Sequence, residues 1–130
     1  MAEKKIKFRE IKLESETKIL LGKDENSNDE LMKEFKGRDN IILHTSKPGS
    51  PFCVIEGNFK PSNKDIKASG QVCASYSQDW RDNKKDVIVH VFTGKDILKR
   101  RWMKKGSWKV KNPRIIKIKK RDIENIEKKK

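Results

Sequence analysis

Cysteine is scarce in this chain of 130 residues, and long apolar runs are missing. The two cysteines, Cys53 and Cys73, are too few to cross-link a secreted fold, and they form no Cys-x-x-Cys pair. We interpret both as reduced, buried thiols of a cytoplasmic protein; a single disulfide between them is the open alternative. No apolar run is long enough to span a membrane, and the first residues lack the apolar core of a signal peptide.

Groups that could act as nucleophiles or metal ligands are equally few. Besides the cysteines, the chain has only His44 and His90, and the spacing of these four residues matches no compact ligand motif. Cys53, Cys73 and His90 fall in apolar segments, where a packed side chain is the ordinary outcome. We therefore expect a protein that is not an enzyme and that holds no cofactor or metal. A small Cys/His enzyme is the weaker alternative.

Acidic residues are nearly absent from residues 95–121. This stretch contains 13 Lys and Arg and a single acid, Asp96, so it carries +12 of the formal net charge of +14. Protein surfaces ordinarily mix both signs, and a block of one sign predicts a polyanionic partner. Nucleic acid is the first candidate.

The basic block also has features of a folded surface. Trp102 and Trp108 lie among its cations, and residues 114–119 alternate like a half-buried strand. Trp102 is the expected stacking residue for an unpaired base, with Trp108 nearer the core; alternatively, both rings are core and the lysines only maintain solubility. The predicted nucleic-acid-binding residues are Lys99, Arg100, Arg101, Trp102, Lys104, Lys105, Lys109, Lys111, Arg114, Lys117 and Lys119.

A second candidate contact is the turn that follows the apolar residues 41–43. It offers hydroxyls, backbone amides and a lysine that could hold a phosphate, although it lacks the spacing of a nucleotide-binding P-loop. The alternative, to which we give equal weight, is that Pro48 and Gly49 only reverse the chain there. The residues of this possible phosphate-binding turn are His44, Ser46, Lys47 and Ser50.

Hydrophobic periodicity and turn residues predict an α+β fold with a single, mostly antiparallel twisted sheet and two main helices. Ser27 and Ser62 are the expected helix caps, each with an acidic residue three positions on. We expect the residues after Asp122 to fray. The expected strands lie near residues 6–11, 17–21, 40–44, 52–55, 87–92 and 114–119, and the expected helices near 28–36 and 63–80.

Several short motifs follow one another in the order seen in a known domain. They are Gly22-Lys23-Asp24-Glu25-Asn26, Asp29-Glu30-Leu31, Ile42-Leu43-His44-Thr45, Pro48-Gly49-Ser50, Ala74-Ser75-Tyr76-Ser77, Val87-Ile88-Val89, Lys95-Asp96-Ile97 and Lys105-Gly106. From Thr17 to Lys119 the chain resembles a free-standing member of the NFACT-R family. It departs from the family at Leu43, where an aromatic residue is common, and at Pro51, where His is frequent.

The resemblance implies an RNA-binding module of ribosome-associated quality control proteins, which engage tRNA and the large ribosomal subunit. We therefore expect a cytoplasmic module that contacts tRNA or ribosomal RNA in translation, ribosome quality control or tRNA metabolism. The alternative is an interaction protein for an acidic partner or an anionic surface. A membrane is disfavoured because Pro113 and the strand-like alternation interrupt any basic amphipathic helix. The expected segments are an N-terminal edge segment (1–16), the RNA-binding domain (17–121) and a charged tail (122–130).

Overall fold

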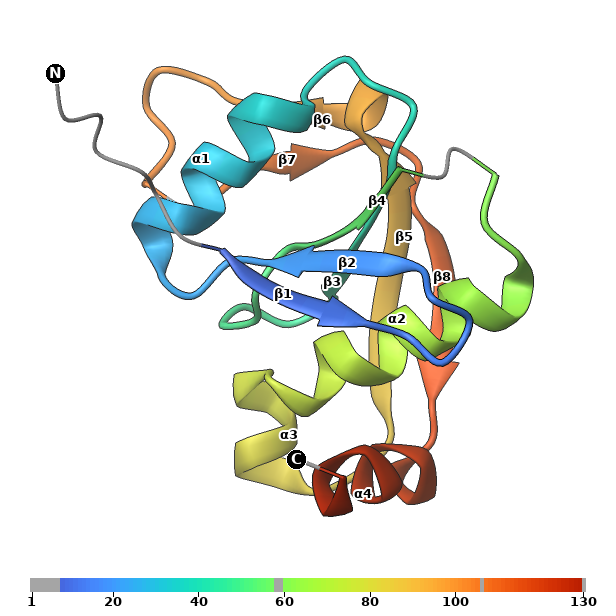
Figure 1. Cartoon of the computed structure of the whole chain (residues 1–130). Coiled ribbons are helices and arrows are strands. Elements are labelled where there is room, and N and C mark those ends of the chain that lie inside the picture. Colours follow the sequence, from blue (N-terminus) through green and yellow to red (C-terminus); the bar gives the residue numbers. More distant parts are fainter. Residues whose placement is uncertain (1–7, 58–59, 106, 130) are drawn as a thin grey trace, which may run out of the picture.

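The structure, a computed structural model, describes residues 8–57, 60–105 and 107–129. Its main element is a six-stranded antiparallel sheet in the order β1-β2-β4-β3-β5-β8, accompanied by a two-stranded sheet, β6-β7 (Figure 1). The strands are β1 (Arg9–Lys12), β2 (Lys18–Leu21), β3 (Ile41–Thr45), β4 (Cys53–Glu56), β5 (Val87–Thr93), β6 (Ile97–Leu98), β7 (Lys109–Val110) and β8 (Arg114–Ile118). The helices are α1 (Glu25–Phe35), α2 (Asn63–Ser75), α3 (Gln78–Asn83) and α4 (Lys120–Lys128), with a 3-10 turn, η1 (Gly94–Asp96).

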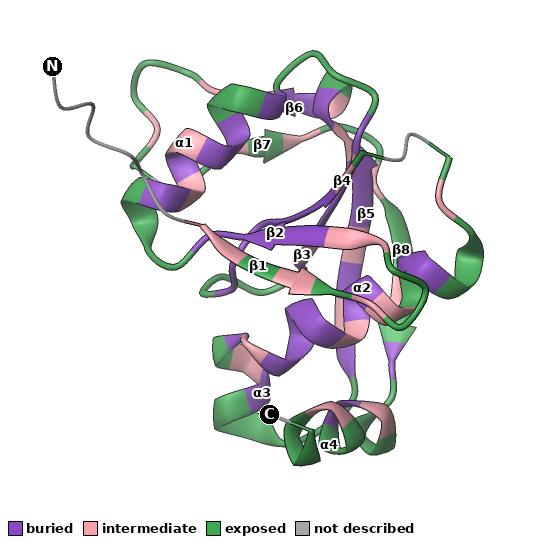
Figure 2. Ribbon diagram, in the orientation of Figure 1, coloured by how far each residue is buried: buried purple, intermediate pink, exposed green. Residues whose placement is uncertain are grey.

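The predicted α+β class and antiparallel sheet are confirmed, and the large sheet separates two hydrophobic cores. Because side chains alternate across a strand, one face packs on α2, α3 and α4, and the other on α1 and the small sheet. Figure 2 shows that burial is concentrated on the inner strands and that β8 is largely exposed. The small sheet was not predicted.

Helix α1 begins three residues earlier than expected. Asp24, not Ser27, is its cap: the Asp24 carboxylate accepts a hydrogen bond from Ser27 N at 2.8 Å, and Ser27 Oγ accepts one from Asp24 N at 3.0 Å. The far end of α1 touches η1, where a Cβ on Gly94 would lie 1.9 Å from the carbonyl oxygen of Phe35. This contact fixes α1 against the chain that leads into the basic block.

The second predicted helix is two helices. Ser62 caps α2 as predicted, but α2 ends at Ser75, and Ser77 Oγ then accepts a hydrogen bond from Trp80 N at 3.1 Å to start α3. Trp80 still reaches the core and is buried. The apolar stripe therefore continues through a break in the backbone.

Both ends of the described chain join the fold. β1 is an edge strand, as expected, although Ile6, which we placed in it, lies outside the described residues, as does Gly106. The expectation that residues after Asp122 fray is wrong, because α4 buries Ile123 completely and Lys120 N donates to Asp86 Oδ1 at 2.8 Å. Among the described residues no helix has the length and apolar character that a membrane span needs.

Candidate nucleic-acid interface

The predicted nucleic-acid-binding residues are exposed with one exception. Trp102 is the most exposed, at 78%, and Lys99 is the exception. No ion pair joins the exposed cations to a carboxylate in the described part of the chain, whereas several lysines elsewhere are paired, such as Lys18 with Glu56 at 3.0 Å. The exposed residues are Arg100, Arg101, Trp102, Lys104, Lys105, Lys109, Lys111, Arg114, Lys117 and Lys119. Their positive charge is therefore uncompensated.

Lys99 has a structural role that the sequence did not indicate. Its ammonium donates to the carbonyl oxygens of Lys104 and Ser107 and forms an ion pair with Asp29 of α1 at 3.5 Å. Its side chain is only 21% exposed, and Nζ lies 5.4 Å from the centroid of the Trp108 ring. Lys99 thus closes the loop between β6 and β7. Because its ammonium is engaged there, Lys99 is not an expected phosphate contact.

Trp108 holds the same loop from its other end. Its Nε1 donates to Asp29 Oδ1 at 3.0 Å, and its ring packs against the core under α1, which agrees with its expected place near the core. The tip of the loop reaches the start of α1: the pKa of Asp24 is lowered mainly by its hydrogen bond from Ser27 N, with a further contribution from the nearby charge of Lys105. The loop therefore presents Trp102 and its flanking cations from a folded base.

The turn after β3 is held by its own hydrogen bonds. Ser50 is buried; its Oγ accepts from Thr45 N at 3.2 Å and donates to Pro51 O at 3.3 Å. Lys47 is exposed and forms an ion pair with Asp79 at 3.6 Å, and Ser46 is exposed beside it. These contacts favour the interpretation as a chain reversal over a phosphate cradle.

His44 lies at the edge of the core next to this turn. Its ring centroid is 4.4 Å from that of Phe52, and Nδ1 lies 2.7 Å from the carbonyl oxygen of Thr45, so Nδ1 must donate. Burial lowers the pKa of His44 to about 4, although the hydrogen bond to Thr45 opposes the shift. The ring is therefore neutral near pH 7 and serves as a flat, packed surface.

One face of the large sheet is covered along only part of its length. α1 and the small sheet cover the part that carries Ile42 and Phe92, both buried. Two residues further along β3 and β5, the same face carries His44 and His90, which are half-buried. On β8 it carries Ile115, which pairs with His90 and is 63% exposed. The uncovered part of this face, which we call the open half, consists of His44, Ile88, His90, Ile115 and Lys117.

The two cysteines are buried and unpaired, as predicted. Burial raises the pKa of Cys73 to about 12 and that of Cys53 well above its usual value. Because the thiolate is the nucleophile and the metal ligand, both groups are held in an unreactive form. In the described part of the chain, no three His, Cys, Asp or Glu residues gather in a way that could hold a metal ion.

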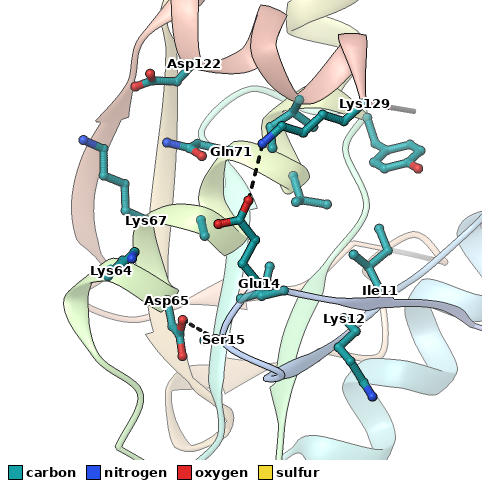
Figure 3. A pocket seen from close by; sticks show the side chains of 15 residues that line it. Ile11, Lys12, Glu14, Ser15, Lys64, Asp65, Lys67, Gln71, Asp122 and Lys129 are labelled. Atoms are coloured by element: carbon teal, nitrogen blue, oxygen red, sulfur yellow. Dashed lines mark hydrogen bonds and ion pairs between the residues drawn. The ribbon is translucent and has the colours of Figure 1, made fainter.

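A groove on the other side of the molecule has a different character. It lies between the loop after β1 and helices α2 and α4, with a volume of about 790 Å³ (Figure 3). Acids and bases alternate around it: Glu14 pairs with Lys129 at 3.5 Å, and Asp65 accepts hydrogen bonds from Ser15 and Thr17. This mixed charge offers no one-sided field to a polyanion.

The fold and the uncompensated charge of residues 100–119 define a small α+β domain with a nucleic-acid-binding type of surface. A family model for the NFACT protein RNA-binding domain matches residues 7–112, which is most of the chain. The chain therefore belongs to the NFACT RNA-binding domain family. Strand β8 and helix α4 lie beyond the matched residues.

Two relatives give this membership a wider context. The chain is 27% identical over 64 residues to the archaeal Rqc2 homolog aRqcH of Methanocaldococcus jannaschii, a match that covers 48% of this chain and 10% of that protein. The C-terminal structure of the fibronectin/fibrinogen-binding protein of Streptococcus suis superposes with a TM-score of 0.79 at 20% identity, covering 95% of this chain and 50% of that one. The second likeness shows that the fold is shared.

Proposed function

We propose that this domain binds tRNA or ribosomal RNA through its exposed basic surface and acts in the cytoplasm in translation, ribosome quality control or tRNA metabolism. Family membership supports RNA as the ligand, and the similarity to an Rqc2 homolog supports ribosome quality control, with the large ribosomal subunit as a partner. The observation that carries the proposal is the set of exposed, unpaired cations between Arg100 and Lys119. Phosphate contacts made by such side chains select RNA by backbone geometry.

A binding module fits the chemistry of the chain better than an enzyme. The buried cysteine thiols have raised pKa values, and the imidazole of His44 is packed against Phe52 and hydrogen-bonded to the backbone. Neither arrangement presents an activated nucleophile next to a base. Trp102, exposed between Arg101 and Lys104, is suited to stack on a base in a loop or at an end of the RNA.

A salt titration of binding to tRNA and to ribosomal RNA fragments tests the proposal. If about five cations neutralise phosphates, the logarithm of the association constant falls with the logarithm of the salt concentration with a slope near −4. Replacing Lys109, Lys111 and Lys117 together with Ala should make the slope less steep by about three units. The charge-matched control replaces Lys33, Lys64 and Lys67 and should leave the slope unchanged.

Two results would contradict the proposal. One is a slope near zero, and the other is the absence of binding at low salt. The acidic-partner alternative is tested in the same experiment by competition with polyglutamate. If polyglutamate displaces RNA at an equal concentration of charge, the surface recognises negative charge alone, and RNA is not its specific ligand.

A further inference from the structure

In the open half, an ordered row of side chains continues outward from buried Phe52, and none of the described helices covers it. Phe52, His44, His90 and Ile115 lie side by side across four neighbouring positions of the sheet, since His44 pairs with His90 and His90 with Ile115. The first two rings are in contact, at 4.4 Å between centroids. Exposure rises along the row, from buried Phe52 to Ile115 at 63%.

This row provides a firm floor of flat and apolar groups. Neighbouring strands are about 5 Å apart, so His90 and Ile115 together span the width of a nucleobase. His44 lies beside His90 in the sheet and is itself fixed by Phe52 and by the carbonyl oxygen of Thr45. Bases that are splayed out of a helix stack on aromatic rings, including histidine.

The charge around the row is positive. Lys117 pairs with Ile88 in the next position along β5 and β8, so it lies on the same face, and Lys119 follows it at the end of the strand. Strands β3, β5 and β8 contain no acidic residue at all. Asp86 directly precedes β5, two positions from Ile88, and its carboxylate accepts a hydrogen bond from Lys120 N at 2.8 Å. An anionic ligand beside His90 and Lys117 therefore meets attraction without a competing carboxylate of the strands themselves.

A protein partner fits this face less well than RNA. Stable protein interfaces bury roughly 800 Å² on each side around an apolar centre. In the described part of the chain, Trp102 and Ile115 are the only exposed large apolar side chains, and only Ile115 belongs to the open half. A second copy of the chain would also bring its own net charge of +14.

We propose that unpaired nucleotides of a single-stranded RNA segment lie on the open half, with their bases against His90 and Ile115 and their phosphates toward Lys117 and Lys119. The proposal rests on the proposed function and names the form of RNA and the residues that read it. Ile115, Lys117 and Lys119 lie beyond the residues that match the family model. A paired duplex cannot use the site, because its bases are already stacked on one another.

Binding of the full chain to a short single-stranded oligouridine and to a blunt-ended RNA duplex tests this proposal. His90→Ala and Ile115→Ala should each weaken binding to the single strand by roughly 5- to 100-fold, with the salt slope unchanged and duplex binding unaffected. Tyr76→Ala, which removes a half-buried ring from the opposite face, is the matched control and should bind both RNAs normally. Circular dichroism checks that each variant is folded.

Nuclear magnetic resonance provides a second measurement on the unaltered protein. The chain contains two histidines, so its spectrum has two sets of imidazole proton signals, which His44→Asn assigns. Adding the oligouridine should shift the His90 signals upfield, because a stacked base shields the ring protons, and should move those of His44 much less. Polyglutamate, which has charge but no bases, should not produce this shift.

The outcomes separate this proposal from the proposed function. If the unaltered protein binds neither RNA, the proposed function itself fails. If it binds RNA while both variants retain full affinity for the single strand and the His90 signals stay in place, RNA lies elsewhere and the open half is not its site. Equal weakening of single-strand and duplex binding, or an equal His90 shift with polyglutamate, would overturn base stacking.

Discussion

The covered and open halves of one sheet face share strands β3 and β5 but have different surroundings. In the covered half, Ile42 and Phe92 are sealed by α1 and the small sheet. In the open half, His90 lies two positions from Phe92 along β5, and its partner Ile115 on β8 faces outward. The difference shows that a strand can stabilise the fold at one end and offer a binding surface at the other without any change in backbone regularity.

The two halves also differ in how charge is used. Around the covered half, Asp29 of α1 holds both Lys99 and Trp108, so that charge there fixes the two ends of the loop between β6 and β7. In the open half, Lys117 is exposed and has no carboxylate of β3, β5 or β8 nearby in sequence or register. Positive charge is paired within the fold in the covered half and remains open to a ligand in the open half.

The largest difference between the halves should be in stability. Phe92→Ala should lower the free energy of unfolding by about 3–5 kcal/mol, because it leaves a cavity between the sheet and α1. Ile115→Ala should change it by no more than about 0.5 kcal/mol, because the side chain is mostly in water. Urea unfolding followed by circular dichroism measures both. Equal losses would mean that the open half is covered in solution.

The sequence predicted the covered half better than the open one. Local patterns were enough for the inner strands and for the presence of α1, because apolar residues recur there at strand and helix spacing. The role of Ile115 was missed. Half-buried Ile116 and buried Ile118 lie on the inner face of β8, and the residues between them alternate to the outer face. Ile115 therefore falls on the same side as Lys117. That alternation is the signal that could have revealed it.

Features that depend on contacts distant in sequence were not predictable. Lys99 is one of many cations in the basic block, and only the fold brings Asp29 to it. Helix α4 has a mostly charged sequence and is held by distant partners, since Trp80 Nε1 donates to Glu127 and Lys120 N donates to Asp86. Tertiary contacts outweigh weak local preference in both cases.

The next effect in size concerns His44, at the boundary between the two halves. Its pKa in the folded state, about 4, is below the ordinary value of 6.5, so the unfolded chain binds the proton more tightly. The contribution of neutral His44 to the free energy of unfolding is therefore complete above pH 6.5 and is lost as the pH falls toward 4. Between pH 7 and pH 5 the free energy of unfolding should decrease by about 2 kcal/mol from this residue alone.

Carboxylates also titrate at the lower end of this range, so a variant is needed to isolate the histidine. His44→Asn keeps a donor at the position of Nδ1 for the carbonyl oxygen of Thr45 but cannot be protonated. Urea unfolding at pH 7, 6 and 5 should show the decrease in the original protein and a smaller one in the variant. Parallel curves for the two proteins would mean that the His44 ring is accessible to water and is not packed against Phe52 in solution.

The smallest effect separates the two uses of positive charge. Lys99→Ala removes the ion pair to Asp29 and the hydrogen bonds to two loop carbonyls, so it should lower the free energy of unfolding by about 1–2 kcal/mol. Lys104→Ala, the matched control in the same loop, should leave stability within about 0.5 kcal/mol and reduce the salt slope of RNA binding by about one unit.

Because the loop held by Lys99 carries Trp102, Lys99→Ala should also weaken binding to tRNA, with the salt slope preserved. A reversed pattern, in which Lys99→Ala reduces the slope without loss of stability, would show that its ammonium contacts phosphate and that the loop is held by Trp108 alone.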